Sequence, residues 1–176
     1  MSDTRLIEAA LAAGAAGAVL IPQRQIVSSA EFRRICEGYG RCWMCPPDTG
    51  DIETAMAQVR RYPWALLYQT IGAIEDSFDI EGMEERAREH ARVSQRVQQA
   101  VRPLLQRPFL HLGCGGCRLC RTCARRAGAP CRHPGQALPS LEGSGVDVYN
   151  TVKGTSLQYV NGRNTVTFFG MVLWET

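Results

Sequence analysis

The densest cysteine run in this chain extends from Cys114 to Pro134 and restricts what the residues around it can fold into. It reads C-G-G-C-R-L-C-R-T-C-A-R-R-A-G-A-P-C-R-H-P and contains five of the eight cysteines. Cysteines recur at every third position from 114 to 123, and Cys131 follows three residues before the proline. Two residues between thiolates let a tight turn wrap one face of a metal centre, and a further cysteine near a proline arrives from outside that turn. The run therefore predicts a metal-binding loop.

The regular spacing favours an iron-sulfur cluster over zinc. Structural zinc sites usually contain two C-x2-C pairs that are separated by a longer loop, and no second pair stands at that distance. A disulfide framework is less favoured, because a dense run without a secretory signal suggests a reducing compartment. Zinc stays the alternative cofactor. Three histidines are weaker candidate ligands, and His133, two residues after Cys131, is better placed than His90 or His111.

A second cysteine group lies near the start of the chain and is followed by two prolines. It consists of Cys36, Cys42 and Cys45, before Pro46 and Pro47. Proline restricts the backbone and removes a hydrogen-bond donor, which favours a fixed loop without helix or strand. Buried free cysteines in a packed loop are the alternative. We interpret the group as ligands, so that residues 36–47 and 114–134 together form a metal lobe.

The number of cysteines matches two clusters of four thiolates each, which predicts two [4Fe-4S] clusters that are adjacent in space. In the favoured assignment Cys131 completes the set of its own run, and Cys114 completes the set near the N-terminus. In the other assignment Cys131 crosses to that set. The predicted ligands are Cys36, Cys42, Cys45, Cys114, Cys117, Cys120, Cys123 and Cys131.

Length and composition predict one soluble, cytoplasmic domain over residues 1–176. The chain has 176 residues, of which 45% are hydrophobic, enough for one sizeable core. The apolar run at residues 9–21 is broken by Gly14 and Gly17 and is too short to span a bilayer. The formal net charge of +3 indicates no particular partner, and we expect neither membrane nor nucleic-acid binding.

Apolar periodicity predicts an α/β or α+β fold in which helices cover a small parallel or mixed sheet. Helices are expected before Gly14, after a cap at Thr49 or Asp51, over 81–106 with a kink or end at Pro103, and over 146–153 with Gly154 as the stop. A short helical segment is expected over 31–36. Strands are expected at 18–21 with a continuation at 26–27, at 64–74 and at 109–112. Asn161-Gly162 predicts a C-terminal β-hairpin between 157–160 and 165–169.

Three motifs together resemble a family of predicted metal-binding proteins of unknown function from anaerobic bacteria and archaea. They are Cys36-x2-Tyr39-Gly40-x-Cys42-Trp43-x-Cys45-Pro46-Pro47, Cys117-x2-Cys120-x2-Cys123-x7-Cys131-Arg132-x-Pro134 and Pro139-Ser140-Leu141-Glu142-x2-Gly145-Val146-Asp147-Val148. The likeness covers most of the chain. It implies a metal cofactor more directly than an activity, and Cys114 lies outside the family's usual motif.

These observations favour an iron-sulfur protein that passes single electrons. A collar of arginines surrounds the run, with no acidic residue between Cys114 and Glu142, and it would favour the reduced cluster and dock an acidic redox protein. The collar comprises Arg118, Arg121, Arg125, Arg126 and Arg132. The alternative for these arginines is that they are solvated or pair with acidic residues elsewhere in the chain. One alternative is an enzyme in which an iron without a protein ligand binds substrate. The other is a zinc-stabilised binding module.

Overall fold

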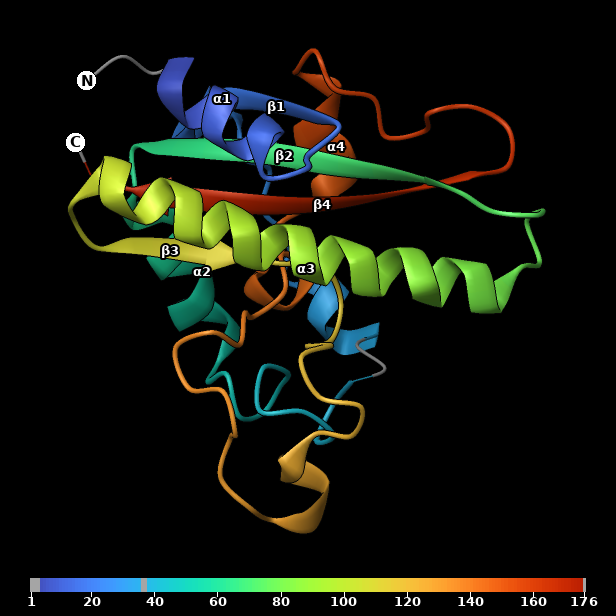
Figure 1. Cartoon of the computed structure of the whole chain (residues 1–176). Helices are drawn as coiled ribbons and strands as arrows, with labels where there is room; N and C mark the ends of the chain where they lie inside the picture. The colour runs from blue at the N-terminus through green and yellow to red at the C-terminus, as the bar shows by residue number, and fades with distance from the viewer. Residues whose placement is uncertain (1–3, 36–37, 176) are drawn as a thin grey trace.

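Four antiparallel strands form one sheet in the order β1-β2-β4-β3. The computed structural model describes residues 4–35 and 38–175, and Figure 1 shows its arrangement. The strands are β1 (Gly17–Pro22), β2 (Trp64–Ala73), β3 (Phe109–Leu112) and β4 (Thr165–Trp174). The two longest, β2 and β4, pair over their whole length from Trp64 opposite Trp174 to Ala73 opposite Thr165. β4 therefore lies inside the sheet, and β1 and β3 form its edges.

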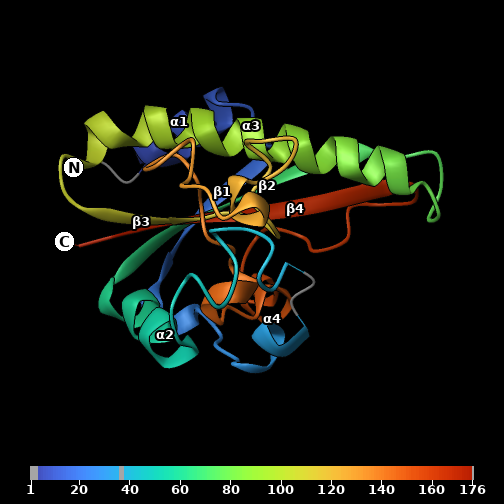
Figure 2. The ribbon, with the colours of Figure 1, turned by 90° about the horizontal axis from the view of Figure 1, so that it is seen from below.

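Two helices, α1 (Thr4–Ala12) and α3 (Ile80–Leu105), cover one face of the sheet, as Figure 2 shows from below. Apolar side chains at helical spacing, such as Val93, Val97 and Val101 on α3, pack against this face. Their partners include Leu66 on β2 and Val172 on β4, both fully buried. The 26 residues of α3 also carry buried polar side chains, which matter for the site below.

The opposite face is covered by α2 (Ile52–Arg61), α4 (Val148–Lys153) and the loops around a 3-10 turn at Glu142–Ser144 (Figure 2). Val59 and Val152 pack there with Leu141 against the other side chains of β2 and β4. Asp51 caps α2 by accepting a hydrogen bond from Thr54 N at 2.8 Å. Further 3-10 turns lie at Gln23–Gln25, Glu31–Ile35 and Ala124–Ala127.

The α+β class is confirmed, and most expected helices and strands are present. The sheet is antiparallel throughout, however, where a parallel or mixed one was expected. β1 ends at Pro22, a 3-10 turn follows at Gln23–Gln25, and the expected continuation at 26–27 forms no strand. α3 continues two residues beyond Pro103, to Leu105. No helix in the part of the chain that the structure describes has the length and hydropathy needed to cross a membrane.

The predicted C-terminal hairpin is wrong. Residues 157–160 form no strand, although β4 begins at Thr165. β4 pairs with β2 over its whole length, and with β3 only from Met171 to Trp174. Asn161 instead uses its side-chain amide to donate to Gln158 O and to Thr167 Oγ1. Turn residues such as Asn161-Gly162 favour a local turn but do not determine which strands pair. Packing of the whole sheet determines that.

Candidate metal centre

Two cysteine-bearing loops lie beyond the β3 edge of the sheet and are tied to each other (Figure 1). Trp43 Nε1 donates to Ala129 O at 2.9 Å. The Arg125 guanidinium forms an ion pair with Asp48 at 2.7 Å and lies 5.2 Å from the centre of the Trp43 ring. A hydrogen bond, an ion pair and a cation–π contact thus join the part of the chain around residue 43 to the part around residue 125.

The space between these loops, here called the thiol cavity, is lined by cysteines from both of them. Its apolar walls include Trp43, Met44 and Leu119, and His133 also lies against it. An open pocket of about 300 Å³ on the same group adds Cys45 and carries Arg41, Arg121 and Arg126 on its walls. Together the two spaces are lined by six of the eight predicted ligands: Cys42, Cys45, Cys117, Cys120, Cys123 and Cys131. Cys36 lies outside the described residues.

The thiols of this group interact with one another. Hydrogen bonds from Cys117 and Cys45 lower the pKa of Cys42 to about 2, and the bond between Cys42 and Cys117 raises the pKa of Cys117. Backbone N–H groups also point at sulfur: Met44 N donates to Cys42 Sγ and His133 N to Cys131 Sγ, each at 3.4 Å. These hydrogen bonds therefore stabilise a thiolate in this group independently of any metal.

Residues 4–35 and 38–175 contain no group of three or more His, Cys, Asp or Glu side chains that could hold a metal ion. The six described cysteines line the walls of a shared space. A set of thiols without carboxylates suits a soft metal centre.

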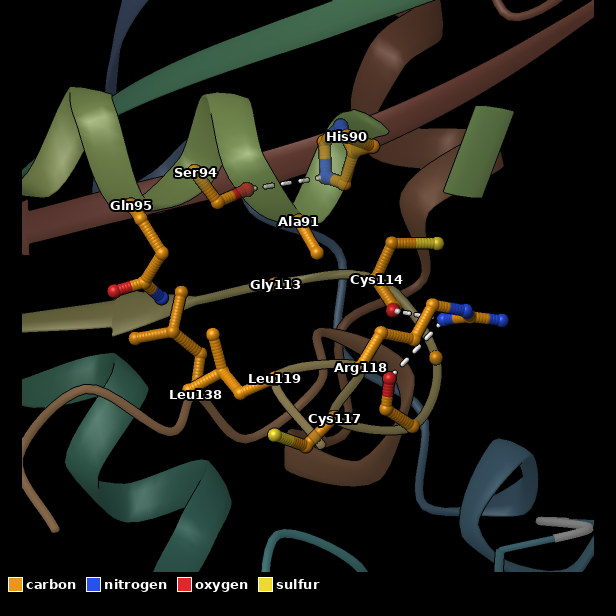
Figure 3. A pocket seen from close by; sticks show the side chains of 12 residues that line it. His90, Ala91, Ser94, Gln95, Gly113, Cys114, Cys117, Arg118, Leu119 and Leu138 are labelled. Atoms are coloured by element: carbon orange, nitrogen blue, oxygen red, sulfur yellow. Dashed lines mark hydrogen bonds between the residues drawn. The ribbon is translucent and has the colours of Figure 1, made fainter. Parts of the chain in front are cut away.

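Cys114 is set apart from the other described cysteines. It lines a different, small cavity, and Figure 3 shows its sulfur and that of Cys117 pointing away from each other. Its Sγ lies 4.0 Å from Glu142 Oε1. Burial, followed by the charge of Glu142, raises the pKa of Cys114 to about 12, so this thiol stays protonated. The structure brings six predicted ligands together and leaves Cys114 outside their group.

Two arginines of the collar form ion pairs with acidic residues from other parts of the chain, which is the alternative that the sequence left open. Arg118 forms an ion pair with Glu84 of α3 at 3.3 Å and donates to the backbone oxygens of Cys114 and Gly116. Arg125 is held by Asp48, and Arg132 donates to Thr122 O at 2.9 Å. Arg121 and Arg126 are exposed on the wall of the open pocket.

Sequence reasoning missed a chain of buried polar side chains between α3 and the sheet. The Tyr68 hydroxyl lies 2.8 Å from both Ser94 Oγ and His111 Nε2. His111 Nδ1 lies 3.2 Å from Gln98 Oε1, and His90 Nδ1 lies 2.9 Å from Thr70 Oγ1. Burial lowers the pKa of His90 to about 4 and that of His111 to about 3. The signals available beforehand were His111 in an apolar strand and His90 at helical spacing from the apolar residues of α3.

Comparison with known proteins identifies one family. The family model described as "Predicted metal-binding protein (DUF2284)" matches residues 19–174, which include both cysteine groups and all four helix-covered strands except the first two residues of β1. Neither the search of curated proteins nor the search of solved structures returned a match.

Proposed function

Because the chain belongs to this family of predicted metal-binding proteins (DUF2284), we propose that its cysteines hold an iron-sulfur centre that passes single electrons. The observation that carries the proposal is the thiol cavity, where cysteines distant in sequence line one space. The residues that would hold the centre are Cys42, Cys45, Cys117, Cys120, Cys123 and Cys131. When bound, such a centre would supply reversible one-electron chemistry.

The donor set supports iron-sulfur over zinc by its number and its chemistry. A structural zinc ion takes four ligands, whereas six described thiols share this site and Cys36 precedes them in the sequence. Soft thiolates without carboxylates among the lining residues suit iron-sulfur clusters. Two clusters that share the lobe would use a set of this size, with Cys36 as an additional ligand.

The surroundings of the thiols support a redox role. Hydrogen bonds to sulfur, from Met44 N and His133 N, stabilise a more negative centre and raise its reduction potential. The apolar wall formed by Trp43 and Leu119 limits water on one side. On the other side the open pocket gives the cysteines access to the surface.

The basic wall of that open pocket supports an acidic redox protein as the partner. Arg41, Arg121 and Arg126 line it beside Cys42 and Cys120, so an acidic surface docked there would lie close to the thiols. Complementary charge of this kind raises association rates and depends on salt. Arg118 and Arg125 hold structural bonds and are not part of this docking surface.

Metal analysis after anaerobic purification tests the proposal. We expect a brown protein with iron and acid-labile sulfide in near-equal amounts. Cys45→Ser and Cys120→Ser should each lose iron, and retention of roughly half in each would indicate two independently loaded clusters. Cys114→Ser is the matched control, and we expect it to keep most of the iron because its thiol lies outside the group. A colourless protein with stoichiometric zinc and no sulfide would rule out the iron-sulfur proposal.

A further inference from the structure

A groove of about 420 Å³ lies beside the edge strand β3, at the C-terminal end of α3, and is here called the outer pocket (Figure 1). One of its walls is β3 itself, which contributes Phe109 and His111. A second wall comes from residues 135–139, the segment that leads away from the metal lobe. Gln98 Nε2 donates to Gly135 O at 3.1 Å, so α3 holds this segment in place. The groove is therefore already formed in the protein without a ligand.

The backbone of β3 is unpaired along the edge that faces the outer pocket. Gly113, the residue after β3, donates through its N–H to Pro139 O at 2.8 Å and accepts from Leu141 N at 2.9 Å. Its backbone groups thus point away from β4. Alternate residues of a strand present their N–H and C=O groups to the same edge, so those of His111 and Phe109 point the same way. In the part of the chain that the structure describes, no hydrogen bond occupies these groups.

Two arginines at the Phe109 end of the groove have no carboxylate partner among the described residues. The Arg102 guanidinium lies 5.5 Å from the centre of the Phe109 ring, and both side chains of the pair are exposed. Arg107 donates only to backbone oxygens, those of Leu105 and Glu175. The described residues that line the pocket include no Asp or Glu. This end of the groove therefore carries positive charge that an acidic ligand would balance.

We propose that the outer pocket binds an extended peptide with acidic residues at its C-terminal end, as a strand added to β3. An unpaired strand edge is a surface to which a segment of another chain adds by backbone hydrogen bonds. The peptide runs antiparallel to β3, because its acidic end lies beside Phe109, where β3 begins and where the two arginines are. Its backbone exchanges hydrogen bonds with Phe109 and His111, and its apolar side chains contact Pro108 and Leu138 on the pocket walls.

This site is separate from the metal centre, and the proposal goes beyond the proposed function without depending on it. The described residues that line the outer pocket include no cysteine, and none of the arginines of the open pocket lines it. Leu138 lines both the outer pocket and the small cavity beside Cys114. A peptide bound at β3 would thus contact the segment that leaves the metal lobe and leave the thiol cavity open.

Peptide binding to the full-length chain tests the added strand and the charge separately. The probe is a fluorescein-labelled pentapeptide of valine, threonine and valine followed by two glutamates, and fluorescence anisotropy measures its binding. We expect saturable binding that becomes about tenfold weaker when lysines replace the glutamates. Two analogues carry N-methyl groups on alternate amides, one analogue for each edge of the peptide strand. We expect one analogue to bind as the parent does and the other to lose binding, because only one edge meets β3.

Three results of this experiment would overturn the proposal. The first is the absence of saturable binding by the acidic probe. The second is equal binding of the two N-methylated analogues, which would mean that the peptide backbone does not pair with β3. The third is full competition by free glutamate at the concentration of the peptide, because the pocket would then be a site for small anions only.

Hydrogen exchange and one arginine variant locate the bound peptide. Mass spectrometry should show slower amide exchange in fragments that cover β3, where the N–H groups of Phe109 and His111 gain partners. Arg102→Gln should weaken binding about threefold, because an exposed charge pair is lost. Arg60→Gln is the control, since Arg60 is likewise exposed in the last turn of a helix, α2, on the other face of the sheet. Unchanged exchange in β3, or equal binding by the two variants, overturns the added strand.

Discussion

Gly170 on β4 leaves the space that the Tyr68 side chain occupies. A Cβ built there would lie 2.2 Å from the Tyr68 hydroxyl and 2.3 Å from the ring carbon that carries it. Tyr68 is fully buried and its hydroxyl is fixed by Ser94 and His111, so it has no free space into which to move. The glycine is therefore required by packing, in a strand where glycine is ordinarily unfavourable.

Gly170→Ala should lower the free energy of unfolding by about 1–3 kcal/mol, because overpacking forces Tyr68 from its position. Strand propensity alone predicts that Gly170→Ala raises the free energy of unfolding. The direction of the measured change therefore distinguishes the two effects. Chemical denaturation followed by tryptophan fluorescence measures the change. Gly116→Ala is the control, since a Cβ there meets nothing within 4 Å, and it should change stability by less than about 0.5 kcal/mol. A Gly170→Ala protein as stable as the wild type would contradict this packing argument.

That Cys117, Cys120 and Cys123 line one space was predictable from sequence, because their spacing is local. The separation of Cys114 from Cys117 was not predictable. The two sulfurs are three residues apart, yet the backbone of the intervening glycines decides that they point away from each other (Figure 3). Tyr68, Ser94 and His111 come from β2, α3 and β3, so only the packed sheet reveals that they touch.

At the scale of elements, α3 was recognised by its apolar periodicity, and the same periodicity places His90 on its buried face. His90 is 2% exposed and hydrogen-bonds to Thr70 of β2, so it is held neutral between helix and sheet. Pairing of the strands was not predictable in the same way, because turn residues do not reveal that β2 and β3 occupy both sides of β4. The buried histidine makes the contact between α3 and the sheet depend on pH.

We expect the free energy of unfolding to fall as the pH drops from about 6.5 to about 4. Burial lowers the pKa of His90 from 6.5 to about 4, so in this window the unfolded chain binds a proton that the folded chain does not. The contribution of neutral His90 to the free energy of unfolding is therefore fully present above pH 6.5. It is lost towards pH 4, by up to about 3 kcal/mol. Urea denaturation at several pH values measures this slope.

The control for this pH dependence is His90→Gln, which removes the titrating ring and keeps a polar side chain next to Thr70. Its free energy of unfolding should change less steeply with pH than that of the wild type over this window. The difference in slope should correspond to the uptake of about one proton. His111 remains in both proteins, and burial lowers its pKa to about 3, so part of the slope is retained in the variant. Identical slopes would show that His90 does not titrate as its burial indicates.

At the scale of the whole molecule, the hydrophobic core and the metal lobe are distinct. Two apolar clusters pack on the two faces of the sheet, and neither contains a residue of 38–47 or 114–134. In the lobe, Trp43, Arg125 and Asp48 make the contacts between the loops, and Leu119 is one of few large apolar side chains. This small apolar burial does not offset the entropy lost when two long loops become ordered. We expect bound metal to supply the remaining free energy of folding.

Metal removal should therefore loosen the lobe and leave the sheet folded. We expect trypsin to cut the apoprotein rapidly after exposed Arg121 and Arg126, while β2, β4 and α3 stay protected. Mass spectrometry of the fragments, with circular dichroism of the same samples, measures both effects. Cys120→Ser should be cut as the apoprotein is, whereas Cys114→Ser should be cut as slowly as the loaded wild type, because Cys114 lies outside the thiol cavity. Equal cutting of loaded and apoprotein would mean that the ion pair and the tryptophan contact hold the two loops together without metal.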